Sequence, residues 1–144
     1  MSDLKEIRRA AMNFLARRDH SEVELSRKLR RKKFADELIQ SVIQALTQEN
    51  LLSQDRFVEN YIHFRRAKGW GPLRIQAELM ERGIHQELID RYVKITDKTW
   101  FSEVRMVWQK RFKNEAPQDF KSRAKQMRFL YSRGFTSEQI ESVF

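Results

Sequence analysis

Apolar side chains recur along the whole chain at the three- and four-residue spacing of an α-helix, and no segment alternates with the two-residue period of a strand. The first stripe runs through Leu4, Ile7 and Ala11 and continues to Leu15. Such a stripe gives a helix one face to bury against its neighbours. Because only 4 Gly and 2 Pro interrupt the stripes, the pattern predicts an all-α fold.

Signals for helix starts and ends separate these stripes. Ser21 and Glu24 have the spacing of a capping box, in which each side chain satisfies a free backbone N–H at a helix start. Residues 69–72, Gly-Trp-Gly-Pro, end one helix and begin another, because proline suits the first helical position. Gly83 is expected to end its helix in the left-handed conformation that glycine adopts at little cost, and Gly134 ends a later helix.

One turn pattern occurs three times. In each copy a leucine and a basic residue precede an apolar anchor, and a glutamate follows three residues later. The anchors are Phe34, Ile84 and Phe135, which lie 50 and 51 residues apart. A period of this length is typical of stacked helical repeats. We therefore predict three tandem three-helix repeats in an elongated, curved array, with boundaries at residues 1–52, 53–96 and 97–144.

Positive charge is spread over the predicted repeats. The chain carries 29 Lys and Arg against 20 Asp and Glu, a net charge of +9. Residues 1–33, 64–82 and 98–144 are basic, whereas residues 34–63 are acidic. Although many charged helix faces serve solubility alone, charge that returns with each repeat favours an anionic or acidic partner contacted at several places.

The chain offers little material for catalysis. It has no Gly-rich phosphate loop and no cysteine, and its three histidines (His20, His63 and His85) lack the spacing of metal ligands on a helix. We predict that the protein is not an enzyme and that it has neither a metal site nor a cofactor. Without a signal peptide or a membrane-spanning stretch, it is expected to be a cytoplasmic monomer that does not contact membranes.

Trp70 differs from the other large aromatic residues, because it lies in a glycine-flanked turn beside several basic side chains. Two interpretations remain open. The indole ring caps the junction between two helices, or it presents an aromatic anchor to a partner. By contrast, Trp100 and Trp108 lie at helical spacing, which is typical of a core stripe.

The candidate partner-binding residues are Trp70 and ten basic residues off the apolar stripes. These basic residues are expected to be exposed, with several of them facing one side of the array. They are Arg17, Arg18, Lys28, Arg31, Lys32, Arg65, Arg66, Lys68, Arg74 and Arg82.

Several stretches resemble the RecX family of bacterial regulatory proteins. They are residues 16–25 (ARRDHSEVEL), residues 55–58 (DRFV) and, as the most specific stretch, residues 68–75 (KGWGPLRI). The resemblance covers nearly the whole chain and is weaker in the third repeat. One departure is Lys33, which stands where relatives usually have glycine or another small residue.

This resemblance implies three tandem three-helix repeats and a function. Members of the family bind the RecA recombinase–DNA filament and modulate it, usually by inhibiting the recombinase, ATPase and co-protease activities that serve DNA repair and the SOS response. The alternative is a helical clamp that binds nucleic acid directly, with a steep dependence on salt. No helix carries an evident set of base-reading residues, so we expect only weak contact with DNA and favour the filament.

Overall fold

The structure is a computed structural model that describes residues 2–144, and this part of the chain contains nine α-helices and no β-strand. Three groups of three helices follow one another, each group packing within itself. The predicted all-α fold with three tandem three-helix repeats is therefore confirmed. The helices are α1 (Ser2–Arg17), α2 (Glu22–Arg31), α3 (Asp36–Gln48), α4 (Gln54–Ala67), α5 (Pro72–Glu81), α6 (Gln86–Tyr92), α7 (Thr99–Phe112), α8 (Phe120–Ser132) and α9 (Ser137–Glu141).

Repeat 1, formed by α1 to α3, encloses a core of its own. The predicted stripes supply this core, which includes Ile7 from α1, Leu29 from α2 and Leu46 from α3. The capping box is also present: the Ser21 hydroxyl accepts a hydrogen bond from the N–H of Glu24, whose carboxylate accepts one from the N–H of Ser21. This exchange fixes the start of α2.

Repeat 2 (α4 to α6) and repeat 3 (α7 to α9) share a second core. Ile75 and Leu79 of α5 belong to the same buried cluster as Trp100 of α7 and Leu130 of α8. Phe135, which follows α8, meets the Trp100 ring edge to face with the centroids 6.4 Å apart. Apolar burial is the main favourable term in folding, so the shared core makes repeats 2 and 3 one cohesive unit. Repeat 1 has a separate core.

The turn after the middle helix of each repeat contains one residue with positive φ. It is Lys33 at +67° in repeat 1, Gly83 at +80° in repeat 2 and Gly134 at +95° in repeat 3. The two glycines were expected as helix ends, and each also faces the preceding repeat. A Cβ on Gly83 would lie 2.2 Å from a methyl group of Val23, and one on Gly134 would lie 2.4 Å from the Cβ of Arg74.

The middle helices thus meet end to end. The start of α2 packs on the turn that follows α5, and the start of α5 packs on the turn that follows α8. Between repeats 2 and 3 the contact is backbone to backbone: the N–H of Gly71 donates to the Arg133 carbonyl at 2.7 Å, and the N–H of Leu73 donates to the Gly134 carbonyl at 2.9 Å. A Cβ on Gly71 would lie 2.5 Å from the carbonyl carbon of Gly134. Glycine is therefore required on both sides of this junction.

The junction between repeats 1 and 2 uses equivalent positions with more polar contacts. The Ser21 hydroxyl donates to the Arg82 carbonyl at 2.8 Å, and the N–H of Glu22 donates to the Gln54 side chain at 3.1 Å. Asp19 accepts hydrogen bonds from Arg56 of α4 at 3.0 Å and from the neighbouring Asn60 at 2.6 Å. Hydrogen bonds and an ion pair join the two repeats here, together with the contact between Val23 and Gly83.

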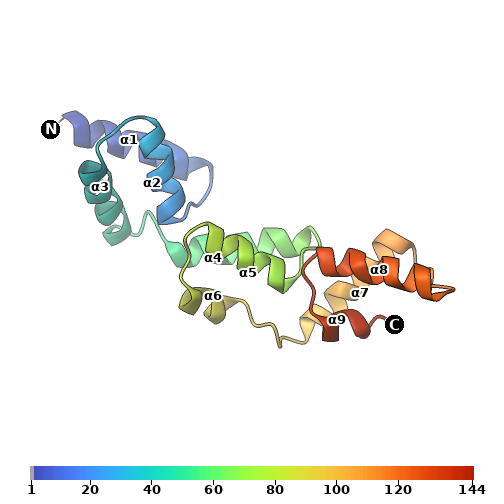
Figure 1. Cartoon of the computed structure of the whole chain (residues 1–144). Helices are drawn as coiled ribbons and strands as arrows, with labels where there is room; N and C mark the ends of the chain where they lie inside the picture. The colour runs from blue at the N-terminus through green and yellow to red at the C-terminus, as the bar shows by residue number, and fades with distance from the viewer. Residues whose placement is uncertain (1) are drawn as a thin grey trace.

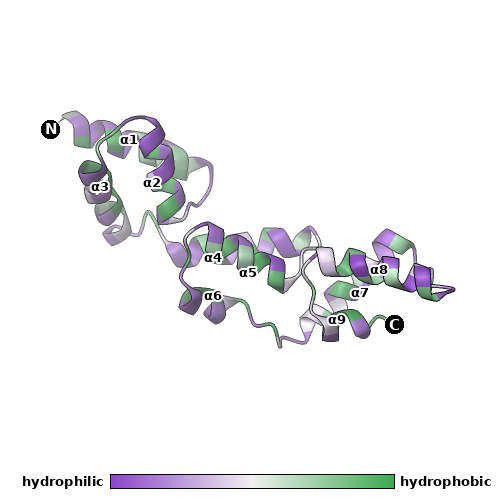
Figure 2. Ribbon diagram, viewed as in Figure 1, coloured by the Kyte–Doolittle hydropathy of each residue, from purple (hydrophilic) through white to green (hydrophobic). Residues whose placement is uncertain are grey.

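The three repeats form an extended row with the chain termini near opposite ends (Figure 1). The accessible surface of 9478 Å² exceeds the roughly 7,900 Å² typical of a compact monomer of 17.5 kDa. Hydrophobic and hydrophilic positions interchange along every helix (Figure 2), as an amphipathic helix in a thin repeat requires. The array therefore offers a long surface for its mass.

Candidate partner-binding surface

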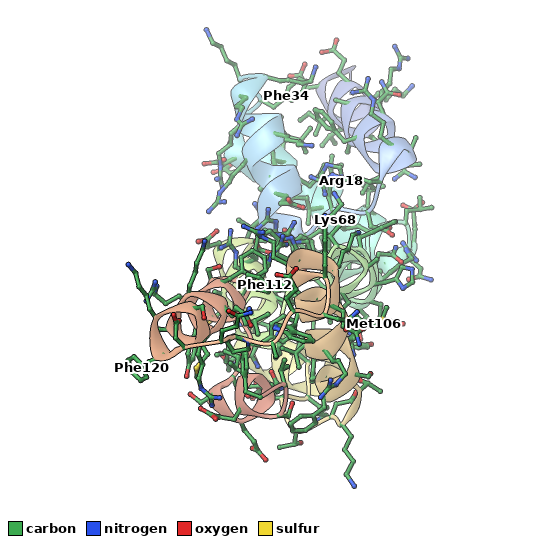
Figure 3. All side chains as sticks on the ribbon, turned by 90° about the vertical axis from the view of Figure 1, so that its right-hand side faces the viewer. Arg18, Phe34, Lys68, Met106, Phe112 and Phe120 are labelled. Carbon is green, nitrogen blue, oxygen red and sulfur yellow. The ribbon has the colours of Figure 1, made fainter. Side chains whose placement is uncertain are left out.

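The candidate residues gather at the two junctions between repeats. We call the group that runs from the first junction along α2 to its end the first basic cluster; it consists of Arg17, Arg18, Lys28, Arg31, Lys32 and Arg82. We call the group around Trp70 at the second junction the second basic cluster; it consists of Arg65, Arg66, Lys68, Arg74 and Arg133. Arg18 and Lys68, one from each cluster, lie in the middle of the view in Figure 3.

His20 and Lys28 form the innermost part of the first basic cluster. The buried His20 ring has Nδ1 at 3.0 Å from the Arg18 carbonyl and Nε2 at 2.8 Å from Nζ of Lys28. These distances fit a neutral imidazole that donates from Nδ1 and accepts at Nε2. Burial lowers the pKa of His20, and burial, followed by the positive charge of Arg18, also lowers the pKa of Lys28. The ammonium group further lies 5.1 Å from the centre of the Phe14 ring.

This geometry predicts a loss of stability in mild acid. Because the folded state lowers the pKa of His20, the unfolded chain takes up the proton first, so the stability present above about pH 6.5 is lost as the pH falls through the folded pKa. His20→Gln should reduce the slope of melting temperature against pH between pH 7 and 5, since glutamine cannot be protonated there. The exposed His63→Gln is the matched control, and an unchanged slope in His20→Gln would contradict the assignment.

Glu24 joins both sides of the first junction. Its carboxylate accepts hydrogen bonds from the Arg18 guanidinium at 3.1 and 3.2 Å, and its second oxygen lies 3.7 Å from Nε of Arg82. Burial alone would raise the pKa of Glu24, but hydrogen bonds from Arg18 and from the N–H of Ser21 lower it. Arg82 therefore joins repeat 2 to repeat 1 through Glu24, whereas Arg18 holds the same carboxylate from within repeat 1.

Within repeat 2, Glu78 binds two cations of the second basic cluster. It accepts two hydrogen bonds from Arg65 at 2.8 and 2.7 Å, one from Arg74 at 3.1 Å and one from the Tyr61 hydroxyl at 2.7 Å. Burial would raise the pKa of Glu78, but hydrogen bonds from Arg65, Tyr61 and Arg74 lower it. Burial and the bond to Glu78 raise the pKa of Tyr61 to about 12. The carboxylate thus stays charged and the phenol neutral.

Arg66 connects repeat 2 to repeat 3. Its guanidinium binds both carboxylate oxygens of Glu103 and the Thr99 hydroxyl of α7, and it lies 3.8 Å from the centre of the Trp100 ring. The side chain is 23% exposed. An ion pair stacked on a core tryptophan contributes to the junction itself.

Trp70 is surrounded by three guanidinium groups. Those of Arg65, Arg74 and Arg133 lie 4.8, 4.5 and 4.3 Å from the ring centre. Arg133 was absent from the predicted set, although the repeat pattern contains its signal: it precedes Gly134 as Arg82 precedes Gly83. The half-buried ring packs against the shared core, as the junction-cap interpretation requires. Its contact with a partner stays a prediction.

The expectation that all ten basic residues are exposed is wrong for four of them. Lys28, Arg65, Arg66 and Arg82 are half-buried, because acids, rings or His20 on neighbouring segments bind them. Arg18 and Arg74 are exposed but paired. Within residues 2–144, no ion pair involves the remaining exposed cations, which are Arg17, Arg31, Lys32 and Lys68.

No group of three or more His, Cys, Asp or Glu side chains in the described part of the chain could hold a metal ion. None of the helices of residues 2–144 has both the length and the apolar character needed to cross a bilayer.

Solved structures show the same architecture. The crystal structure of RecX from Lactobacillus salivarius superposes with a TM-score of 0.83 over 99% of this chain and 94% of the other, at 20% identity. A second crystal structure of a regulatory protein RecX also gives 0.83, over 98% of this chain and 71% of the other, at 18% identity. At such low identity these likenesses concern the fold.

Sequence comparisons reach further. The family models for the first, second and third three-helix domains of RecX match residues 8–46, 53–92 and 101–144. The regulatory protein RecX of Pseudomonas putida is 46% identical over 93% of this chain and 86% of its own length. That of Pseudomonas fluorescens is 41% identical over 99% of this chain and 92% of its own length. With all three domains matched in order, the chain belongs to the RecX family of regulatory proteins.

Proposed function

We propose that the protein binds the RecA–DNA filament and modulates it, usually by inhibiting the recombinase, ATPase and co-protease activities of RecA. In this role it acts in the cytoplasm, as a monomer, on DNA repair and the SOS response. The proposal assigns no reaction to the protein itself. Family membership supports the choice of RecA, since relatives that match nearly the full length carry the name of a regulatory protein.

The observation that carries the proposal is the recurrence of a basic cluster at each junction of an extended row. Arg17, Arg31 and Lys32 of the first basic cluster and Lys68 of the second are exposed and have no ion-pair partner in the described structure. A rod with separated contacts can bind several protomers of a helical polymer at once. Each further contact then forms within the complex, which raises the overall affinity without a deep pocket.

The second candidate, a nucleic-acid clamp, has less support from the same surface. Base stacking needs a free aromatic face. Arg65, Arg74 and Arg133 lie over the Trp70 ring. Arg111 and Arg133 each lie 5.2 Å from the centre of the Phe129 ring. The unpaired cations remain available for phosphate, so direct binding to DNA should be weak and should decline steeply with salt.

The direct test measures the ATPase activity of RecA from the same organism on single-stranded DNA, with and without the protein. The proposal expects a lower rate at concentrations where the protein does not yet bind bare DNA. A rate that changes only where the protein covers DNA would favour the clamp, and an unchanged rate would reject the proposal.

Charge reversal at exposed sites tests the surface. Arg17→Glu combined with Arg31→Glu should raise the concentration needed for half-maximal inhibition about tenfold, because two long-range attractions become repulsions. The matched control is Lys5→Glu with Arg9→Glu, the same charge change at exposed positions nearer the start of α1. If the two double variants lose inhibition equally, total charge rather than the first basic cluster governs binding.

A further inference from the structure

A large groove lies beside the second junction. It has a volume of about 990 Å³ and runs between the end of α4, the outer side of α7 and the end of α8. Its apolar lining includes Trp70, Val107, Phe129 and Phe135, and Met106 contributes to it although 65% exposed. Met106 supplies a flexible apolar side chain that adapts to different occupants.

Positive charge dominates the rim of this groove. Lys68, Lys110, Arg111 and Arg133 line it, and none of them forms an ion pair within residues 2–144. The only lining acid, Glu103, is already bound by Arg66 on the same wall. Four uncompensated cations around an apolar floor make a surface that complements a segment with acidic and large apolar side chains.

The wall of the groove is fixed by the fold. A Cβ on Gly69, whose φ is +87°, would lie 3.1 Å from a methyl group of Val107, so this turn brings α4 and α7 close together. The Arg133 guanidinium donates to the Lys68 carbonyl at 3.3 Å and holds the rim from the side of α8. Both walls thus belong to the cohesive unit of repeats 2 and 3, which limits the ordering cost of binding.

The lining favours a peptide over single-stranded nucleic acid. Arg65, Arg74 and Arg133 lie over Trp70, while Arg111 and Arg133 flank Phe129, whose ring also meets Phe112 edge to face at 5.6 Å. These engaged rings leave little room for stacked bases. The accessible apolar surface of the groove is instead that of Met106 and Val107. This surface suits an aliphatic or aromatic side chain of a peptide whose acidic residues contact the basic rim.

We infer that this groove is the docking site for an acidic peptide segment of a partner protein, anchored by one or two large apolar side chains. The inference deepens the proposed function, on which it rests for the existence of a protein partner. Binding of a free peptide tests the groove without RecA.

The probe is a fluorescein-labelled twelve-residue peptide of Glu and Asp with one Phe and one Leu, followed by fluorescence anisotropy with the full chain. Replacing Phe and Leu of the peptide by Ser should weaken binding about tenfold, since an anchor residue of this kind contributes above about 1.4 kcal/mol. A peptide with Lys in place of every acid should not bind. Equal binding of the Ser peptide would overturn the inference, because charge alone would then explain it.

Protein variants locate the site. Met106→Glu and Lys110→Glu should each weaken peptide binding about tenfold with an unchanged melting temperature, since both side chains are exposed. The control Lys125→Glu makes the same charge change on the exposed part of α8 outside the groove and should bind the peptide normally. Equal losses in Lys110→Glu and Lys125→Glu would also overturn the inference.

A labelled twelve-nucleotide thymidine strand tests the other occupant. Tighter binding of this strand than of the peptide, weakened by Lys110→Glu alone, would assign the groove to nucleic acid. The two proposals fail separately. Inhibition of RecA without peptide binding rejects the groove, and peptide binding without any effect on RecA rejects the proposed function.

Discussion

Gly71→Ala should lower the free energy of unfolding by about 3 kcal/mol, the upper range for overpacking a close contact. The new Cβ would lie 2.5 Å from the carbonyl carbon of Gly134, 2.6 Å from its oxygen and 2.7 Å from the nitrogen of Phe135. All three atoms belong to the backbone, which cannot turn aside as a side chain can. Gly71 itself has φ of −89°, so the cost comes from the neighbouring repeat and not from local strain.

The measurement is urea unfolding followed by tryptophan fluorescence. All three tryptophans, Trp70, Trp100 and Trp108, lie in repeats 2 and 3, so their fluorescence reports on the unit that contains this junction. Lys68→Ala is the control, because it shortens an exposed side chain of the same unit without adding a Cβ, and it should alter stability by less than about 0.5 kcal/mol. A loss below about 1 kcal/mol in Gly71→Ala would mean that the junction adapts to a methyl group.

Arg65→Glu combined with Arg66→Glu should destabilise the fold by about 4 kcal/mol. Each change removes a two-point contact and sets a new carboxylate against an existing one, Glu78 for the first and Glu103 for the second. Arg65 and Arg66 are only 22% and 23% exposed, so water screens this repulsion less than at the surface. The stack of Arg66 on Trp100 is lost as well.

Arg17→Glu with Arg31→Glu makes the same change in total charge at exposed, unpaired positions. We expect this control to lose less than about 1 kcal/mol, the usual range for surface charges. Thermal unfolding by circular dichroism compares the two double variants. Equal melting temperatures would show that the ion pairs of Arg65 and Arg66 contribute nothing to stability, and would make these two residues suitable for binding tests.

The fold could be predicted because its causes are local. The stripe from Leu4 to Leu15, the capping box at Ser21 and the turns at Gly83 and Gly134 each act within a few residues. The repeat itself could be recognised because the same local signals recur in the same order. What each glycine faces could not be predicted, because the partner atoms belong to another repeat.

The surface could be predicted only in part, for the same physical reason. A helical stripe tells which side of its own helix a residue occupies, and this was sufficient for Arg17, Arg31 and Lys32. It carries no information about acids on other elements, such as Glu103, which lies 37 residues after Arg66. The unpredicted pairing changes the design of experiments, because reversing a junction cation perturbs folding and binding together.

The end-to-end contact of the middle helices is directional, because its two sides come from different parts of the repeat. At each junction the start of one middle helix packs on the turn of the following repeat, so both junctions have the same polarity along the array. At the position equivalent to Gly83 and Gly134, whose missing Cβ makes room for the preceding repeat, repeat 1 carries Lys33. The start of α8, which is the equivalent contact position in repeat 3, carries Phe120. This side chain is 86% exposed and lies at the edge of the view in Figure 3. A longer array could therefore be built by adding repeats beyond α9, whereas adding one before α1 would first require glycine at position 33.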